Sequence, residues 1–302
     1  MRLALLGPTA SGKTEAALAL APGFGAEVLC VDSMLVYRGM DVGTAKPTPA
    51  ERAAVRHHLL DVADPGEDFS VARFQSLARD VLADVEARGQ TPLFVGGSGL
   101  YWRAAVDGLE FPGTDPATRR DLELEAAALG PAGLHARLRD MDAEAASRIE
   151  HGNVRRTVRA LEVAAITGRR FSSFATAWKV FPPANLRVAG IRIPASALGR
   201  RIEARVRAML AGGLVDEVHR LQEAGVGPSL TARQAIGYAE VLAHLEGRLS
   251  LDEAAEGTIR RTRALARRQM AWFRRDPRIR WFDTGEGGAA EALDDLKEYY
   301  AA

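Results

Sequence analysis

The sequence predicts an α/β protein with a parallel sheet and a mainly helical insertion. Three observations lead to this prediction. The first hundred residues alternate strand patterns with helical ones, a glycine-rich loop joins the first strand to the first helix, and the region that begins near residue 114 has a mainly helical pattern. Alternation of this kind is typical of parallel strands that are joined by crossover helices.

Short apolar runs predict the strands of this sheet. In the first hundred residues they cover residues 2–6, 27–32, 57–62 and 91–97. Helices are expected at residues 14–21 and 70–89, the second one with Ser70 as its N-cap and Gly89 at its end. Two further strands are expected later in the chain, at residues 186–194 and 279–283.

The change of pattern along the chain predicts its domains. We expect a core formed by residues 1–113 and 186–302, interrupted by a helical insertion domain at residues 114–185. The tail after Gly285 is the part of the chain most expected to fray.

The glycine-rich loop, GPTASGKT, follows the pattern G-x-x-x-x-G-K-[ST] between a predicted strand and a predicted helix. This context is typical of P-loop NTPase-like cores, in which backbone N–H groups and a helix N-terminus surround a phosphate. Lys13 would reach phosphate oxygens, and the Thr14 hydroxyl would bind a Mg²⁺ ion that bridges two phosphates. The loop therefore predicts a diphosphate ligand, which ATP or another molecule could carry. Its predicted phosphate-binding residues are Gly7, Pro8, Thr9, Ala10, Ser11, Gly12, Lys13 and Thr14.

Composition excludes several classes of protein. The chain has 302 residues, 40 basic and 39 acidic, so its net charge of +1 alone does not indicate a polyanionic partner. Its single cysteine, Cys30, excludes an internal disulfide and a zinc site built on cysteines. No segment is long and apolar enough to cross a bilayer, and the first strand begins at once, which predicts a cytoplasmic protein without a signal peptide.

Arginines are concentrated in three helical segments, at residues 155–170, 200–210 and 259–275. Any one of them could be an ordinary solvated helix face. Three such segments, nearly all Arg and scarcely any Lys, favour contact with phosphate or nucleic acid, because the planar guanidinium group binds phosphate through two parallel hydrogen bonds.

Polar residues follow two of the predicted strands. Asp32 and Ser33 end the second strand, so they should face the phosphate loop, and Asp32 could serve either as a base or as a Mg²⁺ ligand. Ser98 follows the fourth strand, but Leu100 breaks the G-x-S-x-G pattern of serine hydrolases. We therefore interpret Ser98 as a hydrogen-bonding group.

Five motifs together resemble the bacterial tRNA dimethylallyltransferase family: GPTASGKT, VDSMLVYRGMDVGTAKP, GGSGLY, RQAIGYAE and ARRQMAWFRRDP. They occur in this order over almost the whole chain. The resemblance implies transfer of a dimethylallyl group from dimethylallyl diphosphate to N6 of the adenosine immediately 3′ of the tRNA anticodon, with Mg²⁺. It also implies that the adenosine is flipped out of the anticodon stack to react.

The resemblance assigns roles to single residues. Asp32 would accept the amine proton, Ser98 would hold the base side of the site, and Lys13 would act on the diphosphate. Arg201 and Arg205 would also stabilise the departing diphosphate. The tRNA contacts that the resemblance implies are Asp32, Ser33, Met34, Leu35, Ser98, Arg119, Arg155, Arg156, Arg159, Arg233, Gln234, Gly237, Tyr238, Arg267, Arg268, Gln269, Trp272 and Arg274.

Two of these positions need comment. Leu35 stands where the family commonly has a Gln that can hydrogen-bond to a base edge, so the way in which the target base is recognised stays open. For Trp272 and Phe273 we favour packing of a helix face against the core over base stacking. His57 and His58 are interpreted as structural residues.

Three alternatives remain to be tested. A P-loop small-molecule kinase or nucleotide-binding switch would need an acceptor site or a guanine signature, and no N-K-x-D occurs in the sequence. An isopentenyltransferase that acts on free adenine nucleotides would not need three Arg-rich helices. A non-catalytic RNA-binding protein would leave the phosphate loop and Asp32 unexplained. The sequence does not give the oligomeric state, for which a monomer is our expectation.

Overall fold

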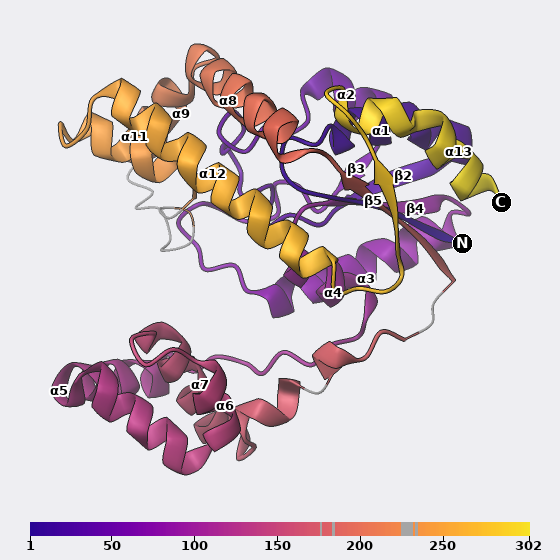
Figure 1. The fold of residues 1–302 in the computed structure, drawn as a ribbon. Helices are drawn as coiled ribbons and strands as arrows, with labels where there is room; N and C mark the ends of the chain where they lie inside the picture. The colour runs from indigo at the N-terminus through magenta and orange to yellow at the C-terminus, as the bar shows by residue number, and fades with distance from the viewer. Residues whose placement is uncertain (176, 183–184, 225–231, 233–234) are drawn as a thin grey trace. The chain divides into compact units, whose positions relative to one another are not determined.

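The structure, a computed structural model, describes residues 1–175, 177–182, 185–224, 232 and 235–302 (Figure 1). The chain forms two compact units, Met1–Val106 with Pro183–Ala302, and Asp107–Pro182. We expected the second unit to begin at residue 114, but it begins earlier, at Asp107. The reason is that Arg159 donates hydrogen bonds to the carbonyl oxygens of Pro112 and Gly113, at 2.6 and 2.8 Å, which ties this segment to the helical unit.

A six-stranded parallel sheet forms the centre of the first unit, which confirms the predicted fold class. The spatial order of the strands is β3-β2-β4-β1-β5-β6. Their bounds are β1 (Arg2–Leu6), β2 (Ala26–Cys30), β3 (His57–His58), β4 (Thr91–Gly96), β5 (Leu186–Arg192) and β6 (Ile279–Asp283).

The third strand is much shorter than predicted. Only His57 and His58 pair with β2. Leu59 and Asp61 then adopt positive φ angles of 64° and 54°, so the chain turns away from the sheet. The expected strand at residues 57–62 was therefore wrong over its last four residues.

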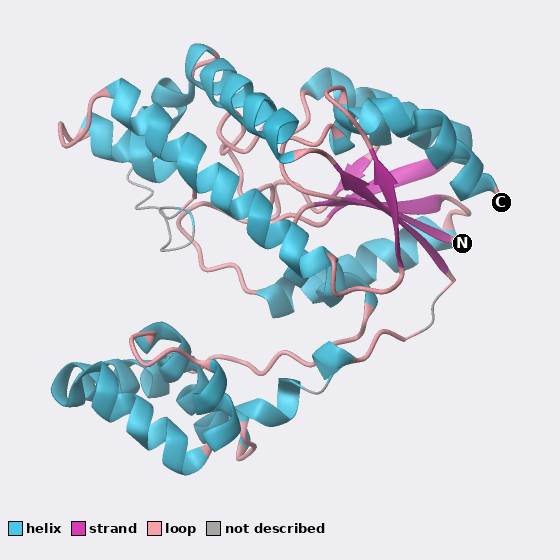
Figure 2. Ribbon diagram, in the orientation of Figure 1, coloured by secondary structure: helices cyan, strands magenta, loops and turns pink. Residues whose placement is uncertain are grey.

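Helices cover both faces of the sheet (Figure 2). Ser70 caps α3 as predicted, because its side chain accepts a hydrogen bond of 3.2 Å from the backbone N–H of Arg73. The helices of this unit are α1 (Lys13–Leu20), η1 (Ala21–Phe24), α2 (Pro49–Ala54), α3 (Val71–Ala87), α4 (Gly99–Val106), α8 (Ala195–Ala211), α9 (Leu214–Glu223), α11 (Tyr238–Leu245), α12 (Leu251–Phe273), η4 (Gly288–Ala292) and α13 (Leu293–Ala301). None of the helices in the described part of the chain has both the length and the apolar character of a membrane span.

The C-terminal tail is part of the core, so the expectation that it frays was wrong. Leu296 and Tyr300 on α13 are fully buried in one apolar cluster with Leu5 of β1 and Leu20 of α1. The Tyr300 hydroxyl also donates a hydrogen bond of 2.6 Å to the carbonyl oxygen of Ala4. The tail therefore holds the first strand and the first helix together.

The second unit is helical, as its sequence pattern predicted. It contains α5 (Pro116–Met141), α6 (Ala143–Arg148), α7 (Val154–Thr167), η2 (Phe171–Ala175) and η3 (Ala177–Lys179). Gly130, with a φ of 68°, and Pro131 interrupt α5. Leu134 and Leu138 after this break pack with Leu161 of α7 in a core of its own.

A buried carboxylate on β2 allows a test of the sheet's stability. Glu27 accepts hydrogen bonds from Arg88 and His58, at 2.7 and 2.6 Å. The hydrogen bond from Arg88 is the main cause that lowers the pKa of Glu27 to about 2. We expect Glu27→Gln to lower the free energy of unfolding at pH 7 by about 1–3 kcal/mol, measured by urea denaturation.

The pH dependence of this loss follows from the direction of the shift. Because the folded-state pKa of Glu27 lies below its ordinary value of 4.5, the stabilisation is complete above that value. It is lost as the pH falls toward about 2, so wild type and Glu27→Gln should converge in acid. Glu86→Gln, which removes an exposed partner of Arg2, is the control and should cost at most about 1 kcal/mol. Equal losses in both variants would contradict the prediction.

Candidate active site at the phosphate loop

The loop between β1 and α1 is held by contacts from distant parts of the chain. Gly12 has a φ of 84°, which favours glycine at this position. The Arg201 Nε donates a hydrogen bond of 2.8 Å to the carbonyl oxygen of Ala10, and the N–H of Thr9 donates one of 2.8 Å to Gln269. Arg201 of α8 and Gln269 of α12 therefore help to fix the shape of the loop.

Lys13 is the buried cation of this loop. Its ammonium group donates a hydrogen bond of 2.7 Å to the carbonyl oxygen of Pro8. Burial, and secondly the nearby charge of Arg205, lower the pKa of Lys13 to about 7, against the opposing effect of Asp32. The charged form of Lys13 thus needs an anion close by to be fully populated near neutral pH.

A small cavity of about 70 Å³ brings two of the predicted catalytic residues, Lys13 and Asp32, together. Lys13, Thr14, Asp32 and Arg205 all contribute to its wall. Asp32 lies just beyond the carboxyl end of β2, and its Oδ1 accepts a hydrogen bond of 2.8 Å from the N–H of Met34. Burial lowers the pKa of Arg205, while Asp32 raises it. The apolar and small residues of the wall include Ala17, Val28, Cys30, Leu35, Val95 and Gly97.

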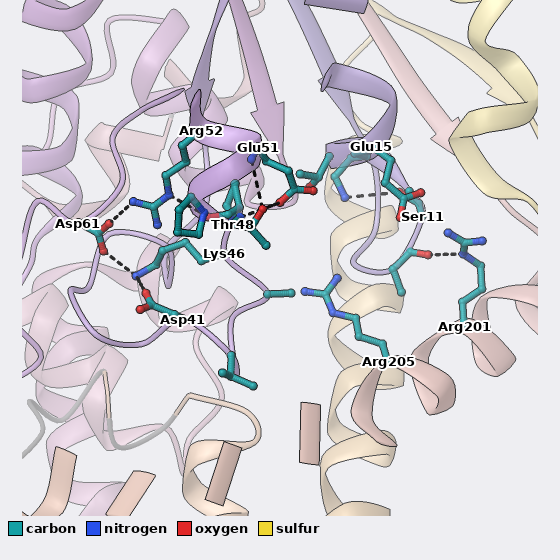
Figure 3. Close-up of a pocket in the computed structure, with 18 of the residues that line it drawn as sticks. Ser11, Glu15, Asp41, Lys46, Thr48, Glu51, Arg52, Asp61, Arg201 and Arg205 are labelled. Carbon is teal, nitrogen blue, oxygen red and sulfur yellow. Dashed lines mark hydrogen bonds and ion pairs between the residues drawn. The ribbon is translucent and has the colours of Figure 1, made fainter. Parts of the chain in front are cut away.

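Figure 3 shows a larger cavity, whose volume is about 1130 Å³. It shares Lys13, Thr14 and Arg205 with the small one. Part of its wall is an ion-pair network that the sequence analysis did not identify. The Lys46 ammonium group lies 2.6 Å from the carboxylate of Asp41 and 2.7 Å from that of Asp61. Arg52 also pairs with Asp61, at 2.7 Å. The motif VGTAKP contains Lys46, but it gave no sign of these partners.

The loop before Lys46 is fastened by a buried carboxylate of α9. Glu217 accepts hydrogen bonds from three successive backbone N–H groups, those of residues 41–43, at 2.8–3.1 Å. The Tyr238 hydroxyl donates to the same carboxylate at 2.5 Å. Tyr238 is buried, and its ring leaves no room for a Cβ atom on Gly43. Its role in the structure is therefore to shape the loop, while its contact with tRNA stays a prediction.

This loop in turn contacts Arg205, which lies on the wall of the small cavity. The carbonyl oxygen of Thr44 accepts a hydrogen bond of 3.2 Å from Arg205. Glu217 thus acts on the position of Arg205 through the backbone of residues 41–44. No local sequence pattern could have indicated this, since about 175 residues separate Glu217 from the N–H groups that it binds.

Ser98 lies at the start of α4, next to the strand that leads to Asp32. Its N–H donates a hydrogen bond of 3.2 Å to the carbonyl oxygen of Val31, and its hydroxyl accepts one of 3.4 Å from the N–H of Tyr101. Ser98 is half-buried and does not belong to the wall of either cavity. Its predicted role on the base side of the site stays a prediction.

The predicted tRNA-binding arginines fall into two groups. Arg155 and Arg156 on α7, and Arg267, Arg268 and Arg274 at the end of α12, are exposed. Arg119 and Arg159 instead each lie 2.7 Å from Glu162, whose side chain is fully buried. These two have a structural partner within the helical unit. Arg233 and Gln234 lie outside the described residues.

Two aromatic residues near the end of α12 differ in burial. Phe273 belongs to the core, as predicted, with 1% of its surface exposed. Trp272 is 40% exposed, and its ring packs on the backbone of Gly99, where a Cβ atom would lie 2.8 Å from it. The predicted packing of this helix face against the core therefore holds in full for Phe273 and in part for Trp272, whose ring contacts α4 while part of its surface stays exposed.

A parallel sheet with a glycine-rich loop between its first strand and first helix defines a P-loop-like α/β protein. Two families match the sequence, the IPP transferases over residues 35–276 and the isopentenyl transferases over residues 1–67. Because the first match covers more than half of the chain, the protein belongs to the IPP transferase family.

Curated relatives and a solved structure agree with this assignment. The chain is 52% identical to the tRNA dimethylallyltransferase of Kineococcus radiotolerans, over 94% of this chain and 91% of that protein. It is 50% identical to the one of a Nocardioides species, over 96% and 93%. Its structure is similar to that of the tRNA isopentenylpyrophosphate transferase of Bacillus halodurans, with a TM-score of 0.72 and 38% identity over 99% and 95% of the two chains.

Proposed function

We propose that this protein transfers a dimethylallyl group from dimethylallyl diphosphate to N6 of the adenosine immediately 3′ of a tRNA anticodon. The observation that carries the proposal is the small cavity in which Asp32 lies with Lys13 and Arg205. A carboxylate and two cations suit a reaction in which a proton and a diphosphate leave the reacting atoms. The names of the relatives supply the tRNA and the dimethylallyl group.

Asp32 is the general base in this proposal. The N6 amine attacks C1 of the donor, a new C–N bond forms, and the bond from C1 to the diphosphate oxygen breaks. The N6 proton passes to Asp32, and the electron pair of the broken bond leaves with the diphosphate. Because Oδ1 of Asp32 already accepts the N–H of Met34, Oδ2 is the oxygen that we assign to the proton.

The loop amides, Lys13, Arg201 and Arg205 hold the diphosphate as it leaves. The oxygen atoms of this site also suit Mg²⁺. This ion prefers hard oxygen ligands and is usually held by one or two protein groups together with substrate phosphates. Thr14 offers a hydroxyl oxygen on the wall of both cavities. When bound, Mg²⁺ would neutralise charge on the diphosphate.

The acceptor is an anticodon stem-loop. The exposed arginines at the end of α12 and on α7 carry the charge that suits an RNA backbone. The adenosine must leave the anticodon stack before its amine can reach a base inside a cavity. We therefore propose that the protein binds tRNA and flips this nucleotide.

The direct test is incubation of the protein with labelled dimethylallyl diphosphate and total tRNA, followed by nucleoside analysis. We expect label in N6-isopentenyladenosine, and no labelled nucleoside when the protein is left out. Efficient prenylation of AMP would favour an adenine-nucleotide isopentenyltransferase. Transfer of phosphate from ATP, with no prenylated product, would favour a small-molecule kinase.

The exposed arginines predict a strong salt dependence. We expect the logarithm of tRNA affinity to fall steeply with the logarithm of salt concentration, as measured by filter binding. Arg156→Ala and Arg268→Ala should each lower the magnitude of this slope by about 1. Arg79→Ala, which removes an exposed arginine of α3, is the control and should leave the slope unchanged. A flat response in the wild type would contradict tRNA as the acceptor.

A further inference from the structure

The segment at residues 285–292 lies directly against the phosphate loop. The N–H of Ala289 donates a hydrogen bond of 2.8 Å to the carbonyl oxygen of Ser11, in the middle of that loop. Gly288, the residue before it, has a φ of 64° and would place a Cβ atom 2.6 Å from the same oxygen. Only glycine at position 288 allows the two segments to approach so closely.

The segment is itself held in place from two sides. The carboxylate of Glu291 accepts hydrogen bonds from the N–H groups of Gly285 and Gly287, the second at 2.7 Å. Arg201 joins the segment to the loop, because its Nη1 donates to the carbonyl oxygen of Glu286 at 3.1 Å while its Nε donates to that of Ala10 at 2.8 Å. Figure 3 shows this Arg201 side chain extending from its helix toward the loop. The contact with Ser11 thus comes from a fixed turn.

The bond to Ser11 determines how one donor of the loop is aimed. A peptide group is planar and trans, so the C=O of Ser11 and the N–H of Gly12 point in opposite directions. Fixing the carbonyl oxygen therefore fixes the direction of the Gly12 N–H. Backbone N–H groups of such a loop bind phosphate only when they converge on it. A peptide that is free to rotate would lose this donor for part of the time.

We infer that Gly288 and Ala289 are positioning residues, which hold the Ser11–Gly12 peptide in the orientation that binds the diphosphate of the donor. The inference rests on the proposed function for the identity of the donor. It assigns the last part of the chain a role in substrate binding in addition to its role in the core. The tail would then act on the site without touching the donor.

The test compares two Gly→Ala variants with matched backbone strain. Gly288→Ala adds a Cβ atom against the Ser11 oxygen, whereas Gly89→Ala has a similar φ of 70° and no atom within 4 Å of its new Cβ. We expect Gly288→Ala to raise the KM for dimethylallyl diphosphate and the Kd of inorganic pyrophosphate at least about tenfold, with the KM for tRNA changed less than twofold. Gly89→Ala should lower the thermal midpoint through backbone strain alone and leave all three constants unchanged.

A second variant covers the case in which Gly288→Ala does not fold. Glu291→Gln weakens the turn at an exposed position, and we expect a rise of about two- to fivefold in the same two constants. If Gly288→Ala folds and binds pyrophosphate as tightly as the wild type, the inference is overturned. If Gly288→Ala does not fold, wild-type affinity of Glu291→Gln for pyrophosphate overturns it. The wild type could also transfer no dimethylallyl group while the variants lose affinity for pyrophosphate. That result would support the inference and refute the proposed donor.

Discussion

Asp32→Asn should lower the single-turnover rate of transfer by about a hundredfold or more while tRNA and dimethylallyl diphosphate still bind. The side chain keeps its shape and one oxygen that can accept the N–H of Met34. It loses the negative charge that accepts the N6 proton. A defect of this kind belongs to the chemical step, so rapid-quench measurement with excess enzyme should detect it in full.

Two controls separate the possible causes of the loss. Glu15→Gln removes a negative charge from the wall of the larger cavity, in the first turn of α1, and should keep a rate near that of the wild type. Titration with Mg²⁺ distinguishes a base from a metal ligand at Asp32. If high Mg²⁺ restores most of the activity of Asp32→Asn, the defect is one of metal occupancy and Asp32 is not the general base.

The parts of the site that could be predicted are those that short, local sequence patterns determine. The phosphate loop has its own pattern, and parallel strands place residues such as Asp32 near that loop at one edge of the sheet. The helical positions of Arg201 and Arg205 also follow from a local pattern. For these residues, local geometry and the direction of the chain were sufficient.

The remaining contacts join residues far apart in the chain, and composition gave no sign of them. Glu217 binds the loop at residues 41–43, and Ala289 binds Ser11, although the partners lie far apart in the sequence. Nothing in the sequence distinguishes Gly288 from the other 28 of the 29 glycines; only the structure shows that it lies against Ser11. Such contacts depend on packing of the whole unit, which sequence periodicity does not determine.

Charge patterns had a related limit. The sequence predicted that the arginines of α7 face solvent or RNA, and Arg155 and Arg156 are exposed. It could not predict that Arg159 pairs with Glu162, three residues later, because the burial of that carboxylate depends on the fold of the helical unit. An Arg-rich segment thus indicates a function only for those of its members that the fold leaves at the surface.

Lys13→Ala should reduce transfer about a hundredfold or more and leave the affinity for tRNA nearly unchanged. The ammonium group is the buried cation of the loop, and in the proposed reaction its loss removes a full positive charge that would stabilise the departing diphosphate. The rate is measured with labelled donor, and tRNA affinity by filter binding. An equal loss of tRNA affinity would show that the loop serves RNA rather than the donor.

The pH dependence gives an independent test of Lys13. Because burial lowers the pKa of Lys13 to about 7, the donor-free protein loses this positive charge as the pH rises through 7. Bound diphosphate favours the charged form, so donor binding should take up a proton, and the Kd should rise by up to about tenfold per pH unit above 7. Lys13→Arg keeps its charge over this range and should show neither effect. Calorimetry in buffers of different ionisation enthalpy measures the proton uptake, and equal uptake in both proteins would exclude Lys13 as its source.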